Sequence, residues 1–498
     1  MSDIKTEQST YDHIVKYTGL FGGVQGLTML MNLVRNKIAS VLLGPDGLAL
    51  VNIYNNAVRL VSESTNFGIS ISAVKHVSEL FDTGDTTRIR EFAITVRTWT
   101  LYTALFGTFV CMVLAPWLSV WTFDNYDFTV TYMLLAPIVG MGAVIAGEMA
   151  ILKGLKKLKT VALISVISAA ALLVISAPLY LIWHIDGIVW SLLACQAAIL
   201  IIHLHFSTRA IPWKTALDSK TEFKAGLPML KLGIAYVLAG IFGQGAEYII
   251  RVMILHEGTQ ADVGLYISGY MLTVTYASMV FVAFEADYFP RLSATSGNIQ
   301  RQNTTVNQQI MVSIQLMAPF LSLFLMVLPV LLPLLFSNKF TDAIPMAMSA
   351  TFYMFFKSAL LAAAYLPLAR GDSKMYMLTE LLYDVCIAIA VPYAFSRWGL
   401  VGTGWALSLA GMVDMLFIHI VYRFRYHYII NRRTLNIFAI QFLLFTAAFI
   451  ATQLAEPWLK WPLAALAFAA SISISYRFLS RETTFVAKMK EKFRNRKS

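Results

Sequence analysis

The chain has 498 residues, of which 58% are hydrophobic and 13% are charged, and its formal net charge is +11. This composition indicates a polytopic membrane protein and excludes a set of soluble domains. The Lys and Arg residues are spread over short loops and the C-terminal tail, so they do not form a nucleic-acid-binding patch. Cys111, Cys195 and Cys386 are far apart with no histidine at ligand spacing, which favours packing over metal binding. We expect no metal and no cofactor.

Fourteen apolar segments follow one another along the chain, each long enough to span a membrane. A helix needs about 20 residues to cross a hydrocarbon core of about 30 Å. No short apolar core with a cleavage site follows the polar first sixteen residues, so the first segment is expected to be retained. The expected fold is all-α, with about 14 transmembrane helices. They are 17–43, 47–76, 92–121, 127–153, 160–183, 186–208, 226–256, 262–290, 306–336, 342–369, 374–396, 399–422, 435–455 and 458–478.

The distribution of positive residues predicts an orientation. With the N-terminus inside, the inward loops and termini contain 31 of the 39 Lys and Arg residues, and the outward loops contain only Lys339, Arg397 and Lys460. Such a bias follows the positive-inside rule. We therefore expect an even number of spans, with both termini in the cytoplasm.

A weak internal repeat divides the spans into two halves. Arg35 and Arg251 precede similar Gly-Leu sequences by nearly the same distance, and Lys153-Gly154 and Arg370-Gly371 end the fourth and tenth segments. Because each half has six spans, both halves keep one orientation and are related by an axis along the membrane normal. The expected parts are an N-lobe at 1–208, a cytoplasmic linker at 209–225, a C-lobe at 226–425, an accessory helix pair at 426–480 and a basic cytoplasmic tail at 481–498.

The first two segments carry polar side chains at the three- and four-residue spacing of a helix face, and the corner at 44–47 (Gly-Pro-Asp-Gly) joins them. A cation near the middle of a membrane helix costs about 2.5–3.5 kcal/mol on insertion scales, so Arg35 and Arg59 should not face lipid. We expect them to face a water-filled cavity. Interhelical hydrogen bonding is the structural alternative for these stripes.

Three stretches resemble a known family. They are Lys37-Ile38 through the Gly44-Pro45-Asp46-Gly47-Leu48 corner, the run Asp287-Tyr288-Phe289-Pro290-Arg291-Leu292-Ser293, and the paired Lys153-Gly154 and Arg370-Gly371 corners. In order and placement, over roughly residues 17–425, they resemble the multidrug/oligosaccharidyl-lipid/polysaccharide (MOP) exporter superfamily. The chain is most similar to the polysaccharide branch, the Wzx-type flippases of O-antigen and enterobacterial common antigen units. Its last two spans instead resemble those of fourteen-helix peptidoglycan-precursor flippases.

The resemblance implies a flippase of the bacterial inner membrane. It would move an undecaprenyl-pyrophosphate-linked oligosaccharide from the cytoplasmic to the outer leaflet by alternating access, surrounded by membrane lipids, and we expect a monomer. Cations must meet the pyrophosphate, and Arg is its better bidentate partner. The candidate phosphate ligands and sugar-binding residues are Arg35, Arg59, Arg251, Lys357 and Lys37, with Asn32, Asn55, Asn56, Gln244 and Tyr248.

Acidic residues within the spans are candidates for coupling to H⁺ or Na⁺, since intramembrane carboxylates commonly mark ion pathways. Salt bridging is the alternative, because Arg59 with Glu63 and Arg251 with Glu247 are each four residues apart on a helix. At the cytoplasmic mouth, a gate and a helix-end ion pair both fit the acidic residues. The candidates for coupling or gating are Glu63, Glu148, Glu247, Glu380, Asp384 and Asp414, with Glu285 and Asp287 at the mouth.

Three other functions remain as alternatives. A MATE-like drug/ion antiporter would bind a small cation, which a cationic cavity repels. A lipid II flippase would share the polyprenyl pyrophosphate but carry another headgroup. A membrane glycosyltransferase or polymerase needs catalytic acids in sizeable outward loops, and the outward loops here are a few residues long, so we do not expect an enzyme.

Overall fold

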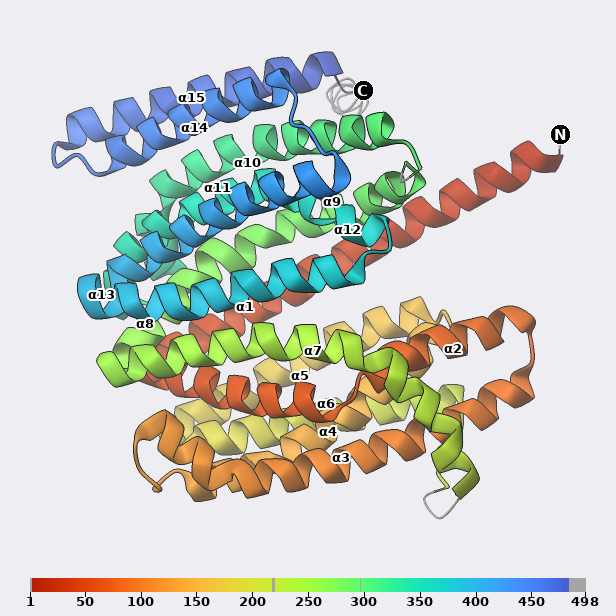
Figure 1. The fold of residues 1–498 in the computed structure, drawn as a ribbon. Helices are drawn as coiled ribbons and strands as arrows, with labels where there is room; N and C mark the ends of the chain where they lie inside the picture. The colour runs from red at the N-terminus through yellow and green to blue at the C-terminus, as the bar shows by residue number, and fades with distance from the viewer. Residues whose placement is uncertain (1, 217–219, 296, 483–498) are drawn as a thin grey trace, which may run out of the picture. The chain divides into compact units, whose positions relative to one another are not determined.

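The structure is a computed structural model, which describes residues 2–216, 220–295 and 297–482; side chains of residues 2–23, 25, 82, 481 and 482 and of parts of α7 and α9 lie outside this description. These ranges contain helices and short connections and no strand, so the expected all-α fold is confirmed (Figure 1). The α-helices are α1 (Ser2–Thr65), α2 (Ile69–Thr83), α3 (Thr86–Phe123), α4 (Thr129–Gly154), α5 (Leu158–Trp183), α6 (Gly187–Ala210), α7 (Lys220–Glu257), α8 (Gln260–Tyr270), α9 (Ala277–Ala294), α10 (Ile299–Leu335), α11 (Ile344–Ala364), α12 (Leu366–Ala369), α13 (Ser373–Tyr426), α14 (Arg432–Thr452) and α15 (Pro457–Glu482). Short helical elements of other types are η1 (His184–Asp186), η2 (Met271–Tyr276) and η3 (Asn338–Ala343).

Eight helices in the described part are long and apolar enough to cross a membrane. Two of these, Leu158–Ala210 and Ser373–Tyr426, each contain two of the spans expected from the sequence. The expected spans outside the eight lie in α1, in α7 and in the α8–α9 segment. A polytopic membrane protein is therefore confirmed, and the number fourteen stays a prediction.

Glycine corners divide two of the long elements. Gly44 within α1 has φ 70° and ψ −169°, and Gly399 within α13 has φ 61° and ψ −154°. Neither conformation is helical, and a positive φ is one that glycine adopts without a steric penalty. Each element is therefore two helices joined at a corner. The corner predicted at 44–47 is confirmed.

The chain divides into two compact units. Unit 1 is Met1–Gly264 with Leu335–Ser337, and unit 2 is Leu265–Leu334 with Asn338–Ser498. Unit 1 includes α7, which packs against α1, α2 and α3. The sequence repeat instead ends the N-lobe at residue 208 and starts the C-lobe with the α7 span. Packing and repeat symmetry are different criteria, so the two lobes stay a prediction.

A buried cluster of unit 1 includes the residue that follows α6. Ile211 is 6% exposed and lies in a hydrophobic cluster built by α2, α3 and α4. The chain therefore does not leave unit 1 where α6 ends. The other members of the cluster are Ile69, Ala73, Ile89, Ala93, Val96, Trp99, Ala150 and Ile151.

In unit 2, α11 crosses the second half of α13 at close range. Ser408 Oγ donates to the Ser349 carbonyl at 2.7 Å and accepts from the Tyr353 amide at 3.0 Å. A β carbon added at Gly411 would lie 2.5 Å from Tyr353 Cδ2, so only glycine fits there. Ser349 meets residue 408 and Tyr353 meets residue 411, which means that the two helices run parallel at this crossing.

The helix pair α14–α15 is joined to α10 by four buried polar side chains, which we call the glutamine clasp. Gln441 Nε2 of α14 donates to Gln315 Oε1 of α10 at 2.6 Å and to Ser475 Oγ of α15 at 3.1 Å. Ser471 Oγ donates to Gln441 Oε1, and Ser475 Oγ to Gln315 Oε1, both at 2.7 Å. Side chains that hydrogen-bond across helices hold membrane helices together. The clasp therefore fixes the pair predicted as accessory to the body of unit 2.

Candidate functional site

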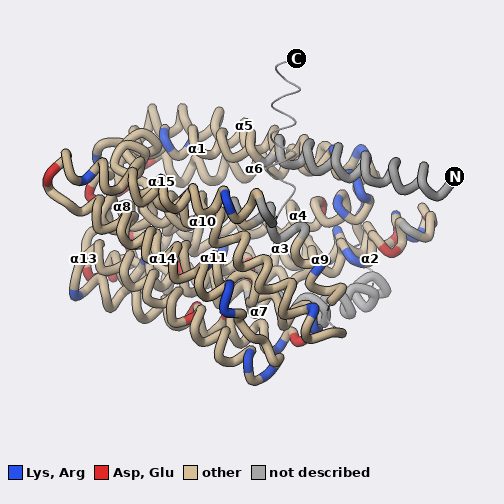
Figure 2. Tube along the Cα trace, turned by 90° about the horizontal axis from the view of Figure 1, so that it is seen from above, with Lys and Arg blue, Asp and Glu red and all other residues tan. Residues whose placement is uncertain are grey.

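Two arginines of α1, Arg35 and Arg59, have no acidic partner among the described residues. Few residues of the chain are charged, so most of the trace in Figure 2 is tan. Arg59 is exposed and Arg35 is half-buried, and neither forms an ion pair with a described carboxylate. At 1.5 Å per residue, Arg35 lies about 13 Å along its helix from the Gly44 corner. A cation at that depth must face water or an anion rather than lipid.

The pairing of Arg59 with Glu63, left open by the sequence, is not formed. Glu63 Oε2 instead accepts a hydrogen bond from Asn66 Nδ2 at 3.2 Å. A β carbon at Gly240 of α7 would lie 3.5 Å from the same oxygen, so the Glu63 carboxylate faces α7. The Arg59 charge is therefore not neutralised by its own helix.

Arg251 does have an acidic partner. Its Nη1 donates to Glu247 Oε2 at 3.1 Å and to the Glu247 carbonyl at 2.8 Å, and the Arg251 side chain is 8% exposed. With the Asn56 amide turned so that its oxygen faces the guanidinium, that oxygen accepts from Nη1 and from Nε, the latter at 3.1 Å. The structure thus contains the structural pairing that the sequence left open for Arg251. It also joins Asn56 of α1 to α7.

Tyr248 and Gln244 lie on α7 with Arg251. Tyr248 is fully buried, and its hydroxyl is 2.6 Å from Thr122 Oγ1 of α3, which is 3.1 Å from the Tyr132 hydroxyl of α4. A hydroxyl engaged in this way already has a partner in unit 1. Gln244 Oε1 is buried and lacks a hydrogen-bond partner among the described residues. Gln244 is therefore the more available of the two for a substrate hydroxyl.

The remaining candidates on α1 stay predictions. Asn55 is exposed, and its Nδ2 donates to the Val51 carbonyl at 2.8 Å, which leaves its side-chain oxygen for other donors. Asn32 and Lys37 are half-buried. Asn32 lies on the polar stripe with Arg35, whereas Lys37 lies about 200° around the helix from Arg35.

Lys357 lies among carboxylates of unit 2. It interacts electrostatically with Glu380 and Asp414, and Asp414 also interacts with Asp384. The crossing described above explains this grouping, because Lys357 and Asp414 follow the Tyr353–Gly411 contact by about one turn on parallel helices. Its Nζ also lies 5.5 Å from the centre of the Tyr353 ring. This acidic group contains one cation and three carboxylates, so its chemistry favours cations.

Two other sets of acidic candidates have different outcomes. The side chains of Glu285 and Asp287 lie outside the described residues. Glu148 of α4 is 1% exposed and pairs with Arg97 of α3, at 2.8 Å from Nε to Oε1 and 3.0 Å from Nη2 to Oε2. The salt bridging that the sequence left as the alternative is therefore present at Glu148, and ion coupling by this carboxylate stays a prediction. No group of His, Cys, Asp and Glu that could hold a metal occurs in the described part of the chain.

Arg97 was not identified from the sequence as the partner of Glu148. It was counted among the 31 Lys and Arg residues of the inward loops and termini. A signal was present in the sequence. Arg97 and Glu148 are opposite charges inside two apolar segments joined by a short turn, which makes the segments antiparallel neighbours. Two unpaired charges in such a hairpin would be costly, so mutual pairing is the expected solution.

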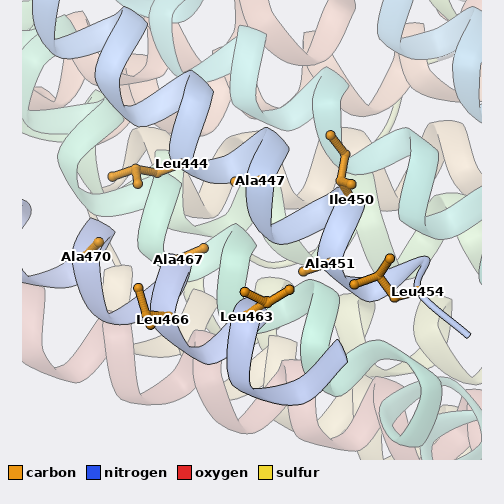
Figure 3. A pocket seen from close by; sticks show the side chains of 9 residues that line it. All are labelled: Leu444, Ala447, Ile450, Ala451, Leu454, Leu463, Leu466, Ala467 and Ala470. Atoms are coloured by element: carbon orange, nitrogen blue, oxygen red, sulfur yellow. The ribbon is translucent and has the colours of Figure 1, made fainter. Parts of the chain in front are cut away.

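A separate apolar hollow lies between α14 and α15. Its volume is about 410 Å³, and its lining residues come from both helices and from the turn between them (Figure 3). The lining carries no charged side chain, so the hollow suits a hydrocarbon chain. The residues are Leu444, Ala447, Ile450, Ala451, Leu454, Leu463, Leu466, Ala467 and Ala470.

Comparison with known proteins shows the family to which the chain belongs. Residues 27–345 match the model of a family described as polysaccharide biosynthesis protein. No curated protein matches the chain. The matched region contains α1 from residue 27 onward, α7 and the first part of unit 2, and therefore most of the candidate residues.

Solved structures share the fold at low sequence identity. The lipid II flippase MurJ, in an inward closed conformation, has 13% identity, covers 92% of this chain and 99% of its own, and has a TM-score of 0.68. An inward-facing MATE family multidrug transporter of the MOP superfamily has 13% identity, coverages of 80% and 94%, and a TM-score of 0.66. A MOP superfamily transporter from Pyrococcus furiosus has 13% identity, coverages of 83% and 95%, and a TM-score of 0.58. The chain therefore has the fold of MOP superfamily transporters.

Proposed function

This chain belongs to the polysaccharide biosynthesis protein family, and we propose from that premise that it is a flippase for a lipid-linked oligosaccharide. The substrate would be an oligosaccharide joined by pyrophosphate to undecaprenyl, such as the repeat unit of O-antigen or enterobacterial common antigen. It would pass from the inner to the outer leaflet of the bacterial inner membrane by alternating access. The observation that carries the proposal is the pair of uncompensated arginines in α1.

The charge on those arginines matches the hardest part of the substrate to move. A pyrophosphate cannot enter hydrocarbon without compensation for its lost hydration. Arg35 and Arg59 offer planar guanidinium groups that hydrogen-bond phosphate oxygens in pairs. Since no described carboxylate neutralises either group, their charge remains available to the substrate. A drug cation would be repelled by the same two groups, which disfavours the MATE-like alternative.

The acidic group of unit 2 is our candidate for coupling. Glu380, Asp384 and Asp414 outnumber Lys357, so uptake of H⁺ or Na⁺ there would lower the excess negative charge. Flipping driven by such an ion would respond to its gradient. Both termini would lie in the cytoplasm, as the bias of Lys and Arg requires.

A lipid II flippase is the second candidate. Two observations favour it: the coverage of 99% of the MurJ chain, and the apolar hollow between α14 and α15, which could accept a polyprenyl tail. The two candidates share the lipid pyrophosphate and differ in the headgroup. Competition between lipid II and a lipid-linked repeat unit in one flipping assay separates them.

The proposal is tested by reconstituting the protein into liposomes with a fluorescent undecaprenyl-pyrophosphate oligosaccharide and measuring its arrival in the opposite leaflet. The Arg35→Gln/Arg59→Gln variant should insert at normal levels and lose flipping. Arg88→Gln is the matched control, because Arg88 is exposed at the start of α3 and pairs with Asp85 at 3.3 Å. Full flipping by the double variant would contradict the proposal.

A further inference from the structure

The chain that leaves α6 is held by Arg97 before it reaches α7. Arg97 Nη2 donates to the Ile211 carbonyl at 3.0 Å, and Nη1 donates to the Pro212 carbonyl at 2.6 Å. The guanidinium carbon also lies 4.8 Å from the centre of the Trp213 ring. One side chain of α3 therefore contacts three consecutive residues of the predicted inter-lobe linker.

The Arg97 guanidinium has all three of its nitrogens engaged. Nε and Nη2 donate to Glu148 of α4, and the two linker carbonyls accept from Nη2 and Nη1, so four of the five N–H groups have a described acceptor. The Arg97 side chain is 0% exposed, and the Glu148 side chain is 1% exposed. A buried ion pair is retained only where its geometry satisfies both charges, and here the two linker carbonyls complete that geometry. Removing the linker would leave Nη1 without its described acceptor.

Two further contacts lie on either side of this point. Ile211 belongs to the buried cluster formed with α2, α3 and α4. Past Trp213, the Ala216 amide donates to Thr98 Oγ1 at 3.0 Å, and Thr98 is fully buried. Apolar packing, a buried charge and a backbone hydrogen bond thus hold residues 211–216 to the same surface.

We infer that residues 211–216 are a permanent part of unit 1 and stay docked on α3 throughout transport, with Arg97 and Glu148 as positioning residues. The part of the predicted inter-lobe linker that is held in this way therefore extends to Ala216. This inference goes beyond the proposed function, because it concerns how the chain is anchored and applies to any substrate. Neither residue contacts the candidate substrate arginines of α1 in the described structure.

The first experiment tests permanence by cross-linking. In a background with Cys111→Ala, Cys195→Ala and Cys386→Ala, the Thr98→Cys/Ala216→Cys pair is oxidised and flipping is measured before and after. A docked linker predicts a high yield of cross-link and unchanged flipping. If flipping stops on oxidation and returns on reduction, the linker must undock during transport and the inference is wrong. The single-cysteine variants under the same oxidant are the controls.

The second experiment tests the anchor. Arg97→Met/Glu148→Leu removes both charges together, which avoids leaving one buried charge and keeps the chance of folding high. The expected result is inserted protein in which the 98–216 cross-link is largely lost. An undiminished cross-link in inserted protein would show that Arg97 does not hold the linker. If the double variant fails to insert, the same cross-link is measured in Arg97→Lys. A lysine keeps the charge but cannot reach Glu148 and both carbonyls, so we expect less cross-linking. Undiminished cross-linking in this variant would show that Arg97 does not anchor the linker.

Discussion

Two regions of unit 1 contain arginines inside apolar helices, and the burial and ion pairing of these arginines are opposite. In α3, Arg97 is completely buried, paired with Glu148 and bound to two carbonyls. In α1, Arg59 is exposed and Arg35 is half-buried, and neither has a described acidic partner. A membrane tolerates both arrangements, because one charge is neutralised by protein and the other by water or a ligand. The difference teaches that the environment of an intramembrane cation, and not its presence, separates a structural role from a binding role.

The largest effect is expected from Arg97→Ala, which tests the structural role of the buried arginine. Loss of one partner leaves the Glu148 carboxylate buried and unpaired, which costs about 3–5 kcal/mol. We expect a strong loss of folded protein in the membrane, measured by abundance and by thermal unfolding in detergent. Arg88→Ala, at an exposed position of the same helix, should change neither. A normally stable Arg97→Ala protein would remove the structural half of the comparison.

Arg251 lies between the two extremes and should give an intermediate effect. Its pairing with Glu247 and Asn56 is buried on the arginine side, whereas Glu247 is 35% exposed and can be partly rehydrated. We expect Arg251→Ala to lower the free energy of unfolding by about 1.5–3 kcal/mol, typical of hydrogen bonds to charged groups.

The Glu247 partner supplies the discriminating variant. Adding Glu247→Gln should restore abundance if the pair is structural. If flipping also returns in Arg251→Ala/Glu247→Gln, Arg251 is not a phosphate ligand. If Arg251→Ala has normal abundance but has lost flipping, Arg251 binds substrate and is not mainly structural.

The glutamine clasp extends the comparison to uncharged groups. Gln441→Leu removes the partner of Gln315 and Ser471 inside unit 2, and we expect a loss of about 1–2 kcal/mol. The readout is the thermal unfolding midpoint together with protease sensitivity of the turn between α14 and α15. Asn436→Leu, at an exposed position of α14 away from the turn, is the matched control and should leave both unchanged. Equal effects of the two variants would mean that the clasp does not hold the helix pair.

The smallest effect is expected at the exposed end of unit 2, and it depends on pH. The Arg425 guanidinium and the Tyr426 hydroxyl hydrogen-bond Asp372 and hold the pKa of its carboxyl below the ordinary value. A lowered folded-state pKa gives stability that is present above the unfolded pKa and is lost as the pH falls through the folded one. Asp372→Asn should therefore lower the unfolding midpoint slightly at neutral pH and have no effect at strongly acidic pH. A difference that is independent of pH would show that the charge of Asp372 contributes nothing.

Helix positions were predictable from the sequence because they depend on local hydropathy. The span expected at 160–183 is α5 (Leu158–Trp183), and the span expected at 186–208 is α6 (Gly187–Ala210). The Gly44 corner followed from glycine and proline chemistry in the same way. Each of these features is decided within one or two turns of chain, so a single sequence contains the information.

Partners between helices were not predictable to the same degree. A helix period gives the face on which Arg251 or Lys357 lies, but not which face of another helix turns toward it. Arg251 is predicted to lie beside Arg35, and in the structure it meets Asn56 of α1, together with the Glu247 pairing that the sequence offers as its alternative. Lys357 appeared with the arginines and lies among carboxylates. Rotation and neighbour order are tertiary properties, and only short hairpins such as α3–α4 reveal them in the sequence.

The residues of the glutamine clasp are synthesised at widely separated times. Gln315 precedes Gln441 by 126 residues and Ser475 by 160. At about 5–20 residues per second, a ribosome adds the first partner about 6–25 s after Gln315 and the second about 8–32 s after it. During that interval α10 carries an amide that lacks the acceptors and donors of the finished protein, and lipid offers it none. We therefore expect α10 to need protection from lipid until α14 and α15 have been inserted.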